Sequence, residues 1–212
     1  FTIGSSSILY LTYMNEIVID GVTDSVGIML NEDGEIWKFN DYSAQSNWSV
    51  VYNSDSVLYS AIIVDHGLGI VMVAVGASGM GVRSINAGET WVLIESLMSQ
   101  NSVDLVEICT FNANGTDTLI TTTVSGDIFH SFDTGVSWTA ATPSLQVALG
   151  VVGVVTSMTI VNGAYAMLVG EGGAIWQLTT LEDTELPSSY PTCVPTRQPS
   201  GEPTSLPTTI PT

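Results

Sequence analysis

The chain has 212 residues, of which 21 are Asp or Glu and only three are Lys or Arg, so its formal net charge is −18. So few basic residues exclude a nucleic-acid-binding protein, because neutralising phosphates needs a basic face. They exclude a polybasic membrane-surface protein for the same reason. A hydrophobic content of 45% is too high for a fully disordered acidic chain.

Four segments of the chain share one pattern, in which two apolar runs are followed by a glycine turn and a third apolar position. The turn glycines recur every 45 to 47 residues, at Gly34, Gly79, Gly126 and Gly173. The runs are short, rich in β-branched residues and bounded by Gly, Asn or Asp, as is typical of β-strands. The first runs cover residues 8–12, 57–64, 103–109 and 155–161, and the second runs cover residues 26–30, 71–75, 119–123 and 165–169.

This period, with about four strands in each repeat, predicts an all-β fold. The fold is expected to be a β-propeller of about four four-stranded blades, or a fragment of a larger propeller. The chain begins at Phe1 and not at Met, so either a leader has been removed or the chain is a piece of a longer protein. The propeller is expected over residues 1–181, with repeats at about 5–52, 53–98, 99–146 and 147–181.

A tryptophan ladder marks the fourth strand of each blade. Trp48, Trp91 and Trp138 follow one another at 43 and 47 residues, and a further 47 residues back lies Phe1. The last repeat stops without a fourth strand of its own, so residues 1–4 are expected to complete it and remove an unpaired edge. Alternatively, the two half-blades join neighbouring molecules or belong to a larger propeller.

Two of the repeats contain an eight-residue pattern, S-x-[DN]-x-G-x-[ST]-W, at residues 84–91 and 131–138. Ser and Asp or Asn side chains hydrogen-bond local backbone groups, and Gly accepts a positive φ. The Trp is a large apolar plug whose N–H needs a partner. The pattern therefore predicts structural hairpin turns built on Ser84, Asn86, Gly88, Trp91, Ser131, Asp133, Gly135 and Trp138.

These octets resemble the Asp-box (BNR) repeats of a β-propeller family that includes sialidases, sortilin-type ectodomains, some glucanases and photosystem-assembly propellers. The resemblance covers about residues 1–180. The box is degenerate in the first repeat, where Asn40 and Asp41 are too far from Trp48, and the fourth repeat lacks it. In that family the box is a structural turn on the rim, so the resemblance implies that role for the two octets and no catalytic one.

The residues argue against the enzymes of that family. Sialidases clamp a carboxylate with several arginines, whereas the predicted propeller holds only Arg83. His66 and His130 lack the spacing of metal ligands. Most acidic residues are expected in turns, as at Asp20, Asp24, Glu32, Asp33, Asp117 and Asp127. No catalytic residue, cofactor or metal site is therefore predicted.

The two cysteines are too few for a disulfide framework. Cys109 lies in an apolar run and is interpreted as a buried free thiol, whereas Cys193 lies in a Pro/Thr segment; a disulfide between them, or with another chain, stays an alternative. The most apolar stretch, residues 147–161, is shorter than the roughly 20 residues that a bilayer-spanning helix needs.

Residues 182–212 are expected to form a Pro/Thr-rich stalk. Prolines recur every four residues from Pro191 to Pro211, which predicts an extended, polyproline-like segment. Such a tail resembles those of secreted or cell-surface proteins of some algae and other protists, with a bare linker as the alternative. Asn47 and Asn114 begin N-glycosylation sequons, and the stalk offers candidates for O-glycosylation at Thr192, Thr196, Ser200, Thr204 and Thr208.

Together these features predict a secreted or cell-surface glycoprotein with a non-enzymatic structural or adhesion role. It is expected to self-associate, or to bind extracellular protein or glycan partners, with no nucleic acid and no membrane insertion. Two alternatives stay open. One is a carbohydrate-active propeller hydrolase that uses paired carboxylates, and the other is a ligand-binding ectodomain.

Overall fold

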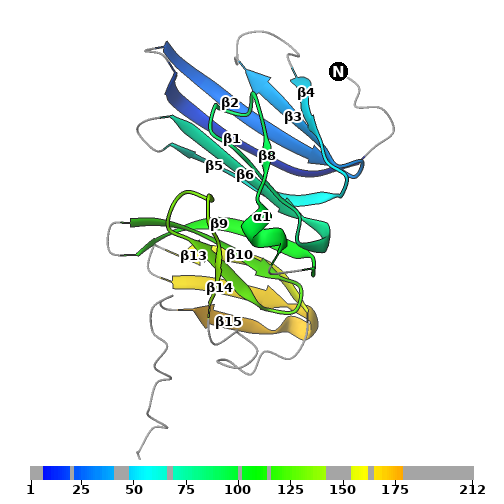
Figure 1. Cartoon of the computed structure of the whole chain (residues 1–212). Coiled ribbons are helices and arrows are strands. Elements are labelled where there is room, and N and C mark those ends of the chain that lie inside the picture. Colours follow the sequence, from blue (N-terminus) through cyan, green and yellow to red (C-terminus); the bar gives the residue numbers. More distant parts are fainter. Residues whose placement is uncertain are drawn as a thin grey trace, which may run out of the picture.

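The computed structural model describes residues 7–19, 22–40, 48–65, 69–99, 102–113, 116–141, 154–161 and 165–178. Within these ranges the chain forms consecutive antiparallel sheets, each a meander whose neighbouring strands follow one another in sequence (Figure 1). The sheets are called sheets 1 to 4 in chain order. Several predicted features lie outside the described residues: residues 1–4, Asn47, His66, Asn114, Cys193 and the stalk at 182–212 with its hydroxyl candidates.

Sheet 1 contains β1 (Ile8–Ile19), β2 (Val22–Asn31), β3 (Glu35–Asn40) and β4 (Trp48–Asn53). Sheet 2 contains β5 (Leu58–Asp65), β6 (Ile70–Gly76), β7 (Gly81–Ser84) and β8 (Val92–Leu93). Sheet 3 contains β9 (Leu105–Ala113), β10 (Thr116–Thr123), β11 (Ile128–Ser131) and β12 (Thr139–Ala140). Sheet 4 has three described strands, β13 (Val155–Val161), β14 (Tyr165–Gly170) and β15 (Ile175–Leu178). The described helices are single turns: η1 (Ala77–Gly79), α1 (Glu95–Met98) and η2 (Glu171–Gly173).

The first strands of the four sheets lie side by side. Strand β1 packs on β5, β5 on β9, and β9 on β13, and Figure 1 shows the sheets following one another in a stack. Meander sheets that meet at their first strands are the arrangement of blades in a β-propeller, so the predicted fold class is confirmed. Among the described strands this close packing runs from β1 to β13 and does not return from β13 to β1.

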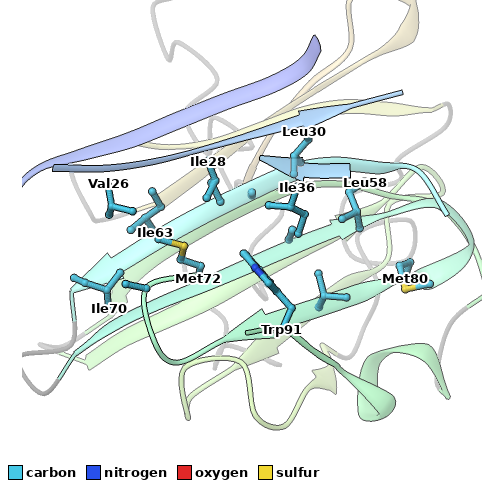
Figure 2. Close-up of a cluster of buried hydrophobic side chains, with 14 residues drawn as sticks. Val26, Ile28, Leu30, Ile36, Leu58, Ile63, Ile70, Met72, Met80 and Trp91 are labelled. Carbon is cyan, nitrogen blue, oxygen red and sulfur yellow. The ribbon is translucent and has the colours of Figure 1, made fainter. Parts of the chain in front are cut away.

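Two hydrophobic clusters fill the spaces between the first three sheets. Strand β6 is buried along its whole length because its residues alternate between them. Met72 and Ala74 belong to the cluster shared with sheet 1, called cluster A, whereas Val71, Val73 and Val75 belong to the cluster shared with sheet 3, called cluster B. Figure 2 shows side chains of cluster A pointing into the space between the two sheets. Sheet 2 is therefore covered on both faces, which explains its continuous apolar run.

Two details of the sequence-based expectations need correction. Asp24 and Asp117 were expected in turns, but they lie in strands β2 and β10. The β1–β2 and β9–β10 hairpins continue to pair beyond the predicted runs, as in the pairs Ile17–Asp24 and Asn112–Asp117. Backbone pairing between the two strands therefore places both aspartates in strands.

Cys109 is a free thiol and is partly exposed. Burial and, to a lesser extent, the negative charge of Glu107 together raise its pKa to about 12. A thiol with this pKa is protonated at neutral pH and is a weak nucleophile. No helix in the described part of the chain is long and apolar enough to span a membrane.

Candidate functional site

The octet at residues 131–138 folds into a turn organised by the Asp133 carboxylate. One carboxylate oxygen, Oδ1, accepts hydrogen bonds from the Ser131 hydroxyl at 2.8 Å and from the backbone N–H of Ser137 at 2.9 Å. The Ser137 hydroxyl donates to the other oxygen at 2.6 Å, and the Gly135 N–H donates to the Ser131 hydroxyl at 2.8 Å. Burial raises the pKa of Asp133, but the hydrogen bonds from Ser137, Ser131 and Val136 outweigh it and hold that pKa below its ordinary value.

The octet at residues 84–91 repeats this geometry with an amide in place of the carboxylate. The Asn86 side-chain oxygen accepts from the Ser84 hydroxyl at 2.9 Å and from the Thr90 N–H at 3.0 Å. The Gly88 N–H donates to the Ser84 hydroxyl at 2.9 Å. The oxygen that both side chains share, and not the negative charge, therefore builds the turn.

Each octet tryptophan packs between its own sheet and the preceding one. Trp91 belongs to cluster A, and its indole N–H donates to the Gly88 carbonyl at 3.1 Å. Trp138 belongs to cluster B, and its indole N–H donates to the Gly135 carbonyl at 3.2 Å. The turn thus satisfies the polar end of each indole while the ring fills the space between blades.

A basic side chain from the preceding blade reaches each octet. Lys38 on β3 forms an ion pair with Glu89, and its side chain is almost completely buried. Arg83 on β7 donates from Nε to the Thr134 carbonyl at 2.7 Å and from Nη2 to the Thr134 hydroxyl at 3.4 Å. The blades are therefore joined by a polar contact beside each apolar cluster.

Strand register shows that these two basic residues occupy one repeat position. In every sheet the pairing of the first two strands shifts at the same place, where Tyr10, Ser60, Glu107 and Ser157 follow the shift. Counting across the ladders from these residues makes Lys38 equivalent to Arg83. The same count places His130 in sheet 3 and Gln177 in sheet 4 at this position. Burial lowers the pKa of His130, and its Nδ1 atom has no hydrogen-bond partner among the described residues.

The residues that follow the shift form a polar network at the first strands, here called the first-strand network (Tyr10, Ser60, Glu107 and Ser157). The Glu107 carboxylate accepts a 2.6 Å hydrogen bond from the Ser60 hydroxyl and a 3.2 Å hydrogen bond from the Ser157 hydroxyl. Ser60 also accepts from the Ile108 N–H at 3.2 Å. A pairing irregularity of this kind changes the direction of a side chain. Here Ser60 of sheet 2 and Ser157 of sheet 4 both reach Glu107 of sheet 3.

Tyr10 joins the network electrostatically. Burial raises the pKa of Tyr10, and the negative charge of Glu107 raises it further, whereas a hydrogen bond with Ser60 acts in the opposite direction. The Glu107 carboxylate thus accepts hydrogen bonds from two serine hydroxyls and interacts electrostatically with Tyr10. Within the described residues, no group of three or more His, Cys, Asp or Glu side chains is placed to hold a metal ion.

The outer faces of the two terminal sheets expose apolar side chains. On sheet 1, Leu11 and Val50 are exposed, and they pair across the strands with Met29, which is buried, and with Trp37, which is half-buried. On sheet 4, Val169 and Ile175 are paired and exposed. The equivalents of Leu11, Met29 and Trp37 in sheet 2 are Ala61, Ala74 and Val82, all buried in cluster A. The outer face of sheet 1 thus has the apolar character of a face that packs on another blade.

Comparison with known proteins supports the fold. No protein-family model matches the chain, and no curated protein matches it. Among solved structures it is similar to one described as YCF48 bound to D1 peptide, a β-propeller, with a TM-score of 0.54 and 14% sequence identity. The match covers 73% of this chain and 47% of that chain, so this chain spans about half the length of the solved relative. At this identity the likeness shows the fold alone.

Sequence reasoning located the octets but missed the contacts between blades. The roles of Lys38 and Arg83 depend on strand register, which the apolar pattern of one strand does not reveal. Glu107 carried a usable signal, because it is an acidic residue in the middle of an apolar run and not at a turn. Its equivalence to Ser60 and Ser157 became visible only through the pairing shift.

Proposed function

We propose that this protein is a non-enzymatic, extracellular structural or adhesion module that assembles with copies of itself. The observation that carries the proposal is the pair of exposed apolar faces on sheets 1 and 4. Consecutive sheets in the chain pack so that one face of a blade covers the opposite face of the next. The same packing between two chains would place sheet 4 of one copy on sheet 1 of the other, which is a head-to-tail contact that can close a ring or extend a filament.

The geometry of this contact gives a sharp test. Leu11 is 58% exposed on sheet 1, and Ile175 is 64% exposed on sheet 4. Leu11→Glu or Ile175→Glu each removes one half of every head-to-tail contact, so each variant alone is expected to be monomeric by sedimentation and electron microscopy. A mixture of the two retains one intact pair of faces and is expected to form dimers. Ile85→Glu is the matched control, because Ile85 is exposed on an octet and on neither face.

Three outcomes would contradict the proposal. The unmodified protein could remain monomeric at high concentration. Either face variant could assemble as well as the unmodified chain. Assembly of Ile175→Glu alone would instead indicate that sheet 1 packs on sheet 1, which is an isologous contact.

The wider assignment follows the sequence. We assign the two octets to the Asp-box class, residues 1–181 to the propeller and residues 182–212 to an extended glycosylated stalk. Glycans at Asn47, Asn114 and the stalk hydroxyls would raise the masses of the native peptides that contain these residues above the masses calculated from their sequences. Native peptides with unmodified masses at all of these positions would contradict the glycoprotein assignment.

A second candidate function is the binding of a peptide or other extracellular ligand. It is favoured by the similar solved structure, which is described as bound to a D1 peptide. Soluble partners captured by the purified monomeric face variants would support this function independently of assembly. The hydrolase alternative needs two facing carboxylates, whereas the hydrogen-bonded partners of Glu107 are serine hydroxyls. Hydrolysis of a glycan that is lost in Glu107→Gln would revive it.

A further inference from the structure

A pocket lies between sheets 2 and 3, beside the octet at residues 131–138. Its volume is about 280 Å³, close to the lower limit for pockets that hold small ligands. Arg83 lines it together with Val92 and Leu93 of β8, the start of α1 at Glu95, and Val136 of the octet. It therefore combines the cation of Arg83 and the carboxylate of Glu95 with aliphatic walls, on a protein that is otherwise strongly acidic.

The Arg83 guanidinium has N–H donors that no hydrogen bond among the described residues uses. A guanidinium has five N–H donors, and within the described residues Arg83 donates one from Nε and one from Nη2, both to Thr134. The nearby Asp133 carboxylate accepts from Ser131, Val136 and Ser137. In the described part of the chain, the recorded ion pair is Lys38–Glu89 and does not involve Arg83.

The equivalent position one blade earlier has a direct ion pair. Lys38 has the register position of Arg83, and its partner Glu89 follows the octet glycine Gly88 directly. In the next octet the residue after Gly135 is Val136, which is 60% exposed. The junction between sheets 1 and 2 thus has a directly paired cation and carboxylate. Between sheets 2 and 3 the position of Glu89 is aliphatic, and Asp133, which stands where the other octet has Asn86, acts on Arg83 electrostatically without a recorded ion pair among the described residues.

We propose that this pocket binds a monocarboxylate attached to a small apolar group, which supplies the carboxylate that Glu89 supplies to Lys38. The planar guanidinium matches a carboxylate in a two-point hydrogen bond. Val92, Leu93 and Val136 are exposed and would be covered by the apolar part of the ligand. The negative charges of Glu95, which lines the pocket, and of Asp133, which acts on Arg83, disfavour ligands with two negative charges. The ligand is either a free carboxylic acid or the carboxyl-terminal residue of a peptide.

The proposal is tested by matched pairs of probes that differ only in charge. N-acetyl-leucine and N-acetyl-leucinamide represent the free acid and its neutral analogue, and a short peptide ending in Leu is used with a free and with an amidated terminus. NMR of the whole chain follows the Arg83 Nε–H and the Val136 amide during titration. Saturable shifts with the acids, and at least about tenfold weaker binding of the amides, are expected for the loss of a charge-assisted pair. The relative affinities of the small acid and the peptide acid then identify the source of the carboxylate.

Three variants separate recognition from folding. Val136→Glu places the internal carboxylate at the position of Glu89, so it is expected to keep the fold and abolish binding of the acids. Arg83→Lys keeps the charge but loses the planar fork, and weaker binding is expected. Lys38→Met changes the equivalent junction and is expected to leave binding unchanged. Equal binding of acid and amide, undiminished binding to a folded Val136→Glu protein, or no saturable shift in the unmodified protein would each overturn the proposal.

Discussion

Replacement of Gly135 by alanine is expected to destabilise the protein through two separable effects. The glycine has a φ of +85°, and an L-residue in this left-handed region costs about 1–2 kcal/mol. An added Cβ would lie 3.0 Å from Val73 Cγ2 and 3.4 Å from Leu119 Cδ1, both fully enclosed in cluster B. Overpacking of this kind costs about 1–3 kcal/mol. The free energy of unfolding should therefore fall by roughly 2–5 kcal/mol, a large part of the total for a domain.

Two further glycines isolate the contributions. Gly172 has a φ of +71° with nothing within 4 Å of the added Cβ, so Gly172→Ala should show the backbone cost alone. At Gly88 the nearest atoms, Met72 Sδ at 3.0 Å and Lys38 Cδ at 3.3 Å, belong to flexible side chains, so an intermediate loss is expected. Urea unfolding followed by tryptophan fluorescence and by circular dichroism measures all three. A Gly172→Ala loss as large as that of Gly135→Ala would refute the packing argument.

Three other predictions concern titratable groups. Because hydrogen bonds hold the Asp133 pKa below its ordinary value, its stabilising contribution is present above the unfolded-state pKa and is lost as the pH falls through the folded-state pKa. Asp133→Asn should fold at neutral pH, as Asn86 does in the other octet, and lose less stability in acidic urea titrations than the unmodified chain. Glu107→Leu leaves two serine hydroxyls without their acceptor and should cost about 1–3 kcal/mol, whereas Glu107→Gln should cost less in the same assay. In a Cys193→Ser background, Cys109 should react with iodoacetamide at pH 8 at least about tenfold more slowly in the folded protein than in urea, because its pKa is raised to about 12.

The sequence was sufficient for the fold because a propeller repeats one local signal. Short β-branched runs, turn glycines and the octets all recur with one period, and each depends on neighbouring residues only. The burial of β6 on both faces also follows from the local pattern, because a strand that is covered on both faces is apolar throughout. These features determine which residues form strands and which strands pair.

The contacts between blades could not be obtained in this way. Whether Lys38 reaches Glu89 depends on which residues of β2 and β3 lie opposite one another and on how sheet 1 sits on sheet 2. A shift of one residue would turn Lys38 to the other face. The pairing irregularity before Glu107 is likewise a property of two strands, so the sequence of β9 alone does not show it.

The repeat position of Lys38, on the third strand of each sheet, differs from one junction to the next. Sheets 1 and 2 share an octet tryptophan, cluster A and the Lys38–Glu89 ion pair. Sheets 2 and 3 share the same kind of tryptophan and cluster B, with hydrogen bonds from Arg83 in place of an ion pair. On the face of sheet 3 opposite cluster B, the Thr118 hydroxyl and the His130 Nδ1 atom are buried without a hydrogen-bond partner in the described residues, which is energetically unfavourable.

Sheet 4 also exposes Val169 and Ile175 on its outer face. A second copy seated on that face, as proposed, would cover this apolar surface and oppose any opening of sheet 4. The repeat position that carries Lys38 in sheet 1 and Arg83 in sheet 2 carries His130 in sheet 3 and Gln177 in sheet 4, so neither Lys nor Arg stands at this position in the last two sheets.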